Sequence, residues 1–275
     1  MILKFNIFEH QRIYAMLRSS LIILLTLFIS NIVPAQILTV DRPSITVDSS
    51  EFFLGSIDFS YNINNQKNTI FKGLLSKADL MYVSNQHEYI LINQFRYYSS
   101  TGSPFISTGY SHFRINFLRQ NKLSYESFVQ LQYDKGRNMP FRFLVGSGIR
   151  YEILARPKNR MHYGIGLMYE RERWKSLDES ETLITPEFIK VSSYISTNTN
   201  LNEYIRLVFV GYYQSGYDEN IERLRNRINV SSSLVVKINS FLSLTTNVNY
   251  QYEDQPIIPI NNTIYSVTNG LRLDF

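Results

Sequence analysis

The chain has 275 residues, no cysteine and a formal net charge of +5 at pH 7. The lack of cysteine excludes disulfides and cysteine-ligated metal sites, and a mild charge without a basic run argues against nucleic-acid binding. The 20 tyrosines and 18 phenylalanines contrast with a single tryptophan. Tyrosine is favoured in β-strands and at membrane interfaces, where its ring meets apolar groups and its hydroxyl stays in water.

Residues 1–35 are predicted to be a secretory signal peptide, with Met16 as an alternative start. Arg18 supplies the positive charge, Leu21–Ile29 is an apolar core of nine residues, and Val33–Ala35 is a small-residue cleavage site. An uncleaved membrane anchor is the alternative, but a spanning helix needs about 20 apolar residues. No cysteine follows the cleavage site, which argues against a lipoprotein. We therefore expect an exported protein.

After a periplasmic lead-in over residues 36–54, the chain alternates apolar and polar side chains in many short segments. This period of two is typical of a β-strand with one apolar and one polar face. We expect about 12 such strands, at Gly55–Ile63, Phe71–Val83, Glu88–Tyr97, Thr108–Leu118, Tyr125–Asp134, Arg142–Ile153, His162–Glu172, Phe188–Thr197, Tyr204–Gln214, Arg225–Ile238, Phe241–Glu253 and Ile264–Phe275.

The last segment ends the chain on an aromatic residue. Its apolar positions are Tyr265, Val267, Leu271, Leu273 and Phe275, and polar or small residues lie between most of them. Such an ending resembles the C-terminal sorting strand of bacterial outer-membrane β-barrels. The barrel-assembly machinery is therefore an expected partner, through the strand that ends at Phe275. A half-buried strand of a soluble sandwich is the alternative.

The connections between these segments alternate in length. Gaps such as Ser84–His87 and Arg119–Lys122 are short, whereas Ser99–Ser107, Arg173–Glu187 and Asp254–Thr263 are longer. Short periplasmic turns and long outer loops are typical of membrane barrels, and most segments have the roughly 9–11 residues that a lipid-facing strand needs.

We therefore predict an all-β protein over residues 55–275. Its fold would be a closed antiparallel up-and-down transmembrane β-barrel of about 12 strands in the bacterial outer membrane. Lipid and lipopolysaccharide would surround the barrel, and both termini would lie in the periplasm. In water, strands with this pattern would expose their apolar faces unless a second sheet covered them.

Three consecutive segments carry a family resemblance. They are Tyr125–Asp134 (YESFVQLQYD), Arg142–Tyr151 (RFLVGSGIRY) and Gly164–Glu170 (GIGLMYE). Around Ser124–Trp174 the chain resembles the bacterial family catalogued as domain of unknown function 481. The resemblance implies an outer-membrane barrel of unassigned biochemical role, and it adds architecture but no mechanism. The end of the signal peptide and the Asn-, Ile- and Tyr-rich composition resemble proteins of the Bacteroidota.

The polar face of the predicted strands carries charges of both signs. We expect them to form a charge network inside the barrel, with Glu126 near Arg114 or Arg142 and Arg150 near Glu170. A path for a small charged or hydroxylated solute is the alternative. The predicted members are Asp58, Glu88, Arg96, Arg114, Glu126, Asp134, Arg142, Arg150, Glu152, Glu170, Glu172, Arg206, Arg227, Glu253, Arg272 and Asp274.

Four glycines share this inward face on adjacent strands: Gly146, Gly148, Gly164 and Gly166. Glycine in a strand often makes room for a bulky neighbour or tightens curvature. The candidate neighbours are Phe128, Tyr194 and Tyr212, and a ligand cleft is the alternative.

The sequence gives little support for catalysis, and we predict no catalytic, cofactor or metal residue. His87, His112 and His162 lie on separate segments, and no Gly-x-Ser-x-Gly nucleophile elbow is present. We expect a structural or adaptor protein of the envelope. A narrow pore is the alternative, and an outer-membrane lipid hydrolase acting through His112 is a third hypothesis.

Overall fold

The structure is a computed structural model that describes residues 51–66, 69–101, 103–178 and 182–275. The predicted signal peptide and lead-in up to residue 50 lie outside the described residues. Within the described part, no helix is long and apolar enough to cross a membrane.

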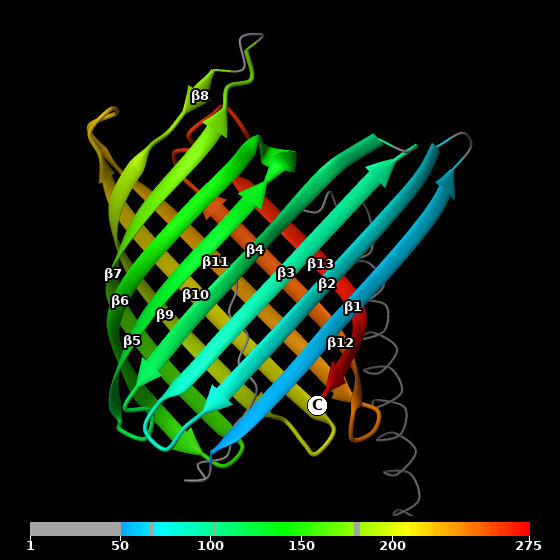
Figure 1. The fold of residues 1–275 in the computed structure, drawn as a ribbon, viewed down its shortest axis with the longest axis vertical. Coiled ribbons are helices and arrows are strands. Elements are labelled where there is room, and N and C mark those ends of the chain that lie inside the picture. Colours follow the sequence, from blue (N-terminus) through cyan, green and yellow to red (C-terminus); the bar gives the residue numbers. More distant parts are fainter. Residues whose placement is uncertain (1–50, 67–68, 102, 179–181) are drawn as a thin grey trace, which may run out of the picture. The chain divides into compact units, whose positions relative to one another are not determined.

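Nearly all of the described chain is β-strand (Figure 1). The strands are β1 (Phe52–Gln66), β2 (Thr69–Val83), β3 (Glu88–Ser100), β4 (Ser103–Phe117), β5 (Leu123–Asp134), β6 (Met139–Arg156), β7 (Asn159–Lys175), β8 (Leu183–Ile184), β9 (Glu187–Asn200), β10 (Ile205–Asp218), β11 (Arg223–Lys237), β12 (Leu242–Glu253) and β13 (Thr263–Asp274). A single 3₁₀ turn, η1 (Lys135–Arg137), joins β5 to β6 among these residues.

Twelve of the described strands form one closed antiparallel barrel. Each strand from β1 to β7 pairs with the next, β7 pairs with β9, and β9 to β13 continue the sheet until β13 meets β1. The two-residue β8 lies outside this ring, paired only with the end of β7. The predicted barrel of about 12 strands is confirmed.

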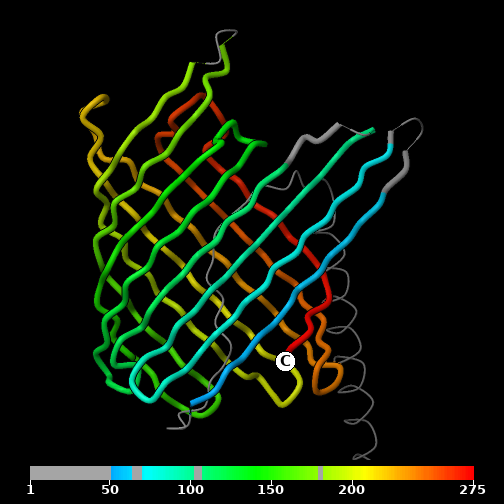
Figure 2. The backbone as a smooth tube through the Cα atoms, viewed as in Figure 1, coloured from blue at the N-terminus to red at the C-terminus, as the bar shows by residue number. Residues whose placement is uncertain are grey.

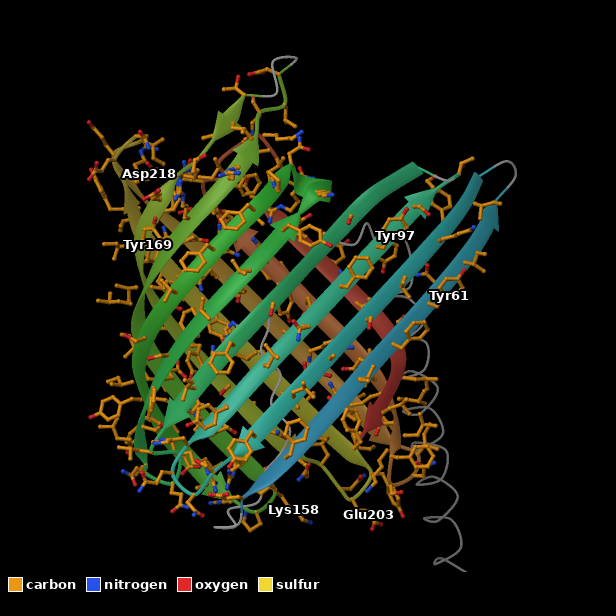
Figure 3. All side chains as sticks on the ribbon, viewed as in Figure 1. Tyr61, Tyr97, Lys158, Tyr169, Glu203 and Asp218 are labelled. Carbon is orange, nitrogen blue, oxygen red and sulfur yellow. The ribbon has the colours of Figure 1, made fainter. Side chains whose placement is uncertain are left out.

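The side chains of the wall divide between an apolar outer face and an inner face rich in polar groups. Outward residues such as Leu167 and Ile189 are exposed, while inward neighbours such as Glu170 and Lys190 are buried. Tyr61, Tyr97 and Tyr169 lie on the outer face by the same alternation (Figure 3). A soluble protein would bury this apolar surface, so the outer face is suited to hydrocarbon.

The two longest connections, from β7 to β9 and from β12 to β13, lie at the same end of the barrel as Asp218, whereas the turns marked by Lys158 and Glu203 at the other end are short (Figure 3). We call these the loop end and the turn end, respectively. Gly55 and Phe275 exchange two backbone hydrogen bonds of 2.8 and 2.9 Å near the turn end.

Several strands extend beyond the predicted segments. β1 begins at Phe52. β3 continues to Ser100 and β4 begins at Ser103, and these two residues pair, so most of the expected long loop over Ser99–Ser107 is strand. The prediction of a long connection at Ser99–Ser107 was therefore wrong. Ser99, Ser100, Ser103 and Pro104 show no apolar alternation, yet they pair in the ladder, because a ladder needs no apolar side chains.

Candidate functional site in the barrel interior

The structure places the predicted charged residues inside the barrel. Glu152, Arg206 and Asp274 are half-buried near the turn end. The others are buried: Asp58, Glu88, Arg96, Arg114, Glu126, Asp134, Arg142, Arg150, Glu170, Glu172, Arg227, Glu253 and Arg272.

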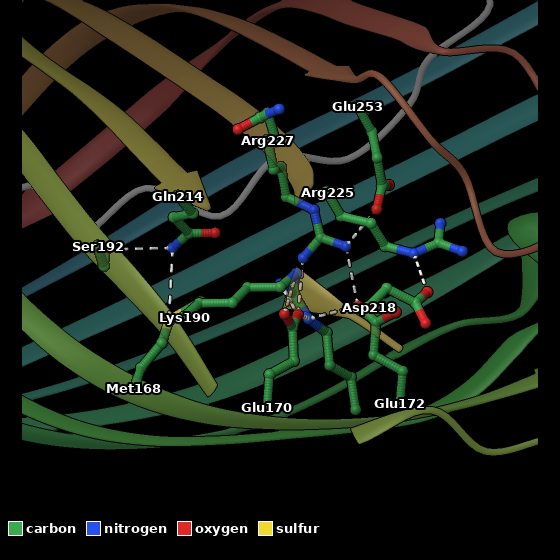
Figure 4. Close-up of polar contacts among 12 residues, drawn as sticks. Met168, Glu170, Glu172, Lys190, Ser192, Gln214, Asp218, Arg225, Arg227 and Glu253 are labelled. Carbon is green, nitrogen blue, oxygen red and sulfur yellow. Dashed lines mark hydrogen bonds and ion pairs between the residues drawn. The ribbon is translucent and has the colours of Figure 1, made fainter. Parts of the chain in front are cut away.

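Six of the buried residues form a cluster near the loop end, which we call the outer ion cluster. Its members come from β6, β7, β9, β11 and β12 and are Arg142, Glu170, Glu172, Lys190, Arg227 and Glu253 (Figure 4). Three formal cations face three carboxylates, so the cluster is neutral overall. Such a balance is required where charges leave water, because an unpaired buried ion is costly.

Glu170 and Arg227 hold the cluster together. The Glu170 carboxylate accepts from Arg142 Nε at 2.6 Å, from Arg227 Nη1 at 2.7 Å and contacts Lys190 Nζ at 2.5 Å. Arg227 Nη2 donates to Glu172 at 3.0 Å and to Glu253 at 2.7 Å. Glu170 and Arg227 thereby join β7 to β11, which lie three positions apart around the ring.

A folded loop lies above the outer ion cluster. In the connection between β12 and β13, Ile258 is buried against Met139 and Trp174 from β6 and β7. Trp174 Nε1 donates to Glu172 at 2.8 Å, which joins this apolar cap to the charges below it.

The 3₁₀ turn adds a further cation to this cap. The Arg137 guanidinium lies 5.5 Å from the Trp174 ring and 3.7 Å from the Glu253 carboxylate. Burial lowers the pKa of Arg137, and Glu253 opposes that shift.

A second layer of contacts fills the middle of the barrel. Arg114 lies 3.6 Å from Glu126 and donates to the Tyr212 hydroxyl at 3.3 Å. The Tyr194 hydroxyl donates to Glu126 at 2.7 Å, and the Arg114 guanidinium also lies over the Phe128 ring. The predicted pairing of Glu126 with Arg114 is confirmed.

The inward glycines make room for this layer. A Cβ on Gly146 would lie 2.7 Å from the Phe128 ring, and one on Gly164 would overlap the Tyr194 ring. Gly148 and Gly166 face each other across β6 and β7, and a Cβ on Gly148 would lie 2.5 Å from the Ile165 carbonyl oxygen. Bulky neighbours and close strands therefore explain these glycines.

The turn-end half of the interior is less uniformly polar than the sequence indicated. The inward residues Met81, Val83, Ile90 and Ile92 form a buried apolar cluster on β2 and β3. Two cavities of about 310 and 390 Å³ lie toward this end and share Arg206, Ser240 and Asp274 in their walls.

Between the outer ion cluster and the middle layer, little space remains. The cavity there has a volume of about 60 Å³ and is lined by residues that include His112, Arg142, Gln214 and Gln251. That volume holds only a few water molecules.

One predicted contact is wrong, and one cation was missed. Arg150 lies opposite Gly164, whereas Glu170 lies opposite Leu144, six residues along the ladder, so Arg150 and Glu170 are too far apart to pair. Arg142, and not Arg150, pairs with Glu170. Lys190 was not among the predicted members, although it lies on the same face of β9 as the inward Tyr194.

The geometry around the histidines gives no support to the hydrolase hypothesis. His112 Nδ1 lies 2.9 Å from the Gln130 amide oxygen, and its ring stacks on Phe128. His162 lies 3.6 Å from Glu152 at the turn end. Over the described ranges, no group of three or more His, Asp or Glu side chains is arranged to hold a metal ion.

The sequence matches the family described as "Protein of unknown function, DUF481" over residues 57–268. The chain belongs to the DUF481 family. The match covers most of the barrel and extends well beyond the three segments that carried the resemblance. No curated protein matches the chain.

Solved structures of outer-membrane proteins are similar to the chain at low identity. The NanC porin is 10% identical with a TM-score of 0.42, over 80% of this chain and 97% of the porin. The translocator domain of the autotransporter NalP from Neisseria meningitidis is 8% identical with a TM-score of 0.47, over 81% and 88%. An anion-selective porin from Comamonas acidovorans is 8% identical with a TM-score of 0.38, over 82% and 99%. We infer no function from likenesses at this level.

Proposed function

We propose that this DUF481 protein is a structural or adaptor barrel of the outer membrane whose interior does not conduct along its axis. The filled interior carries this proposal. Inside the barrel the outer ion cluster bridges β7 to β11, Ile258 covers it from the loop end, and the cavity beneath has a volume of only about 60 Å³. A solute moving along the axis would have to break several buried ion pairs, which is costly.

In this proposal both termini lie in the periplasm and the loop end faces outward. The two longest connections between the described strands, from β7 to β9 and from β12 to β13, lie at the loop end, as long outer loops do in outer-membrane barrels. Phe275 lies near that end, where a C-terminal strand would be available to the barrel-assembly machinery.

The adaptor role has a candidate surface at the loop end. The hairpin of β7 and β8 extends beyond the ring in Figure 1, and Leu177, Leu183 and Ile184 on it are exposed. A non-enzymatic role also fits the hydrogen bond of His112 to an amide. We propose no cofactor.

Conductance in planar lipid bilayers tests this proposal. The purified, refolded barrel should give no discrete current steps, because the cavity beneath the outer ion cluster has a volume of only about 60 Å³. A pore-forming barrel reconstituted in the same membranes serves as the positive control. Reproducible single-channel steps from a heat-modifiable, folded sample would contradict the proposal and favour the narrow pore for small charged or hydroxylated solutes.

A further inference from the structure

The barrel wall is incompletely paired where β1 meets β13. The ladder joins Ser56–Phe59 to Leu271–Asp274 and stops there, although β1 pairs with β2 along all its 15 residues. Toward the loop end, residues 60–66 and 263–270 have no ladder partner on this side among the described residues. The two strands diverge from this point in Figure 2. We call this unpaired stretch the seam.

A side chain marks the point where the ladder ends. The Ser60 hydroxyl donates to the Asn269 carbonyl oxygen at 2.7 Å, one residue past the last ladder pair. Opposite it, a Cβ on Gly270 would lie 2.9 Å from the Phe59 carbonyl oxygen. The strands are therefore still in close contact at Gly270.

β1 and β13 could continue their ladder across the seam in the same register. Continued at the same register, the ladder would place Ile63 opposite Val267 on the outer face and Asn62 opposite Thr268 on the inner face. Both strands are long enough for this pairing. Unpaired backbone N–H and C=O groups are unfavourable in hydrocarbon, so the open seam needs either closure or an occupant.

The two flanks of the seam differ in chemistry. Tyr61, Ile63, Tyr265 and Val267 on the outer flank are exposed and apolar. The inner flank carries Ser60, Asn62, Ser266 and Thr268, which are hydroxyl and amide side chains without charge. An acyl chain suits the first flank and an uncharged hydrogen-bonding group suits the second.

One inner residue already shows an unmet hydrogen bond. Ser266 is fully buried, and its hydroxyl has no hydrogen-bond partner in the described part of the chain. A buried hydroxyl without a partner is unfavourable. A ligand headgroup at the seam would supply that partner. Next to the seam, Asp58 and Arg272 pair with each other at 2.7 Å and need no ligand.

We propose that the seam is a lateral port that takes up an acyl-chain amphiphile with an uncharged hydroxylated headgroup from the membrane. Ile258 and the outer ion cluster cover the axial entrance at the loop end, and the seam offers a direct route from the membrane through the side of the barrel. This inference goes beyond the proposed structural role and does not depend on it, because lateral binding requires no axial conductance.

The test uses the absence of native cysteine and the single tryptophan, Trp174. In a Trp174→Phe background, Thr268→Trp places a fluorescent reporter on the inner flank. Ser231→Trp places a matched reporter on the inner face of β11, away from the seam. The probe is a monoacylglycerol with a brominated chain, added to phosphatidylcholine vesicles that contain the refolded protein.

If the seam binds the probe, the brominated monoacylglycerol should quench the tryptophan at position 268 at least twice as strongly as the tryptophan at position 231. The pair Ile63→Cys and Val267→Cys, oxidised within one chain, should close the seam and abolish this difference, and reduction should restore it. The pair Ile57→Cys and Leu273→Cys, which is already in register, controls for folding and oxidation and should leave the quenching unchanged.

Several results would overturn the proposal. Equal quenching at the two positions would show that the probe does not enter the seam. Failure of the 63–267 pair to cross-link while the 57–273 pair does would show that the seam cannot close in register. Cross-links formed only between chains would show that the free edges pair with a second copy.

Discussion

Gly148 and Gly166 show how single residues set the distance between two strands. They face each other across β6 and β7, and the Cα of Gly166 would lie 2.8 Å from a Cβ on Gly148. No flexible side chain is there to move away, so an added methyl group must push the backbone apart.

We expect Gly148→Ala to destabilise the barrel by about 1–3 kcal/mol, as overpacking does in other closely packed structures. Urea unfolding of the refolded protein in lipid vesicles measures this change. Gly211→Ala on β10 is the matched control, because the nearest atom to its Cβ would be 3.5 Å away. Equal stabilities of the two variants would contradict the close approach of β6 and β7.

At the scale of elements, the outer ion cluster joins strands that are not neighbours in the sheet. Glu170 on β7 bonds Arg142 on β6, Lys190 on β9 and Arg227 on β11. Removing its charge would leave these cations without their shared partner in a buried place. Breaking a buried pair from one side costs about 3–5 kcal/mol.

Glu170→Gln should therefore lower the temperature at which the folded band disappears on a gel far more than Glu187→Gln does. Glu187 pairs with Arg171 at 3.3 Å, but both side chains are about half exposed, at 49% and 48%. Exposed pairs of this kind contribute about 0–1 kcal/mol. Similar losses in the two variants would show that the cluster does not tie the strands together.

The sequence predicted which way most side chains face, because a period of two fixes the face of each residue. It therefore assigned Glu170, Arg227 and Arg142 to the interior. It did not predict the register between strands, which parity leaves open, and this explains the wrong pairing of Arg150 with Glu170. Ile258 lies in a loop without periodicity, so no pattern indicated that it would cover the interior.

The apolar cluster of Met81, Val83, Ile90 and Ile92 marks another limit of sequence reasoning. In β2 and β3 both faces carry apolar residues, such as Leu91 outside and Ile90 inside. A continuous apolar run does not show which of its residues face inward, so this apolar cluster was not predicted.

At the scale of the whole molecule, the barrel has the polarity of a membrane protein. The outer wall exposes residues such as Ile189, at 72%, and Leu167, at 59%, while charged side chains are buried inside. A closed ring lets the backbone pair within the wall, apart from the seam, as a hydrocarbon environment demands. Solubility without lipid or detergent would be incompatible with this surface.

Insertion into lipid vesicles followed by gel electrophoresis tests this central claim most directly. The protein, refolded with phosphatidylcholine vesicles, should migrate differently before and after boiling, because a closed barrel resists detergent until it is heated. Its strands should also be protected from protease in the vesicles. A protein that stays in solution without vesicles and migrates identically in both samples would contradict the membrane barrel.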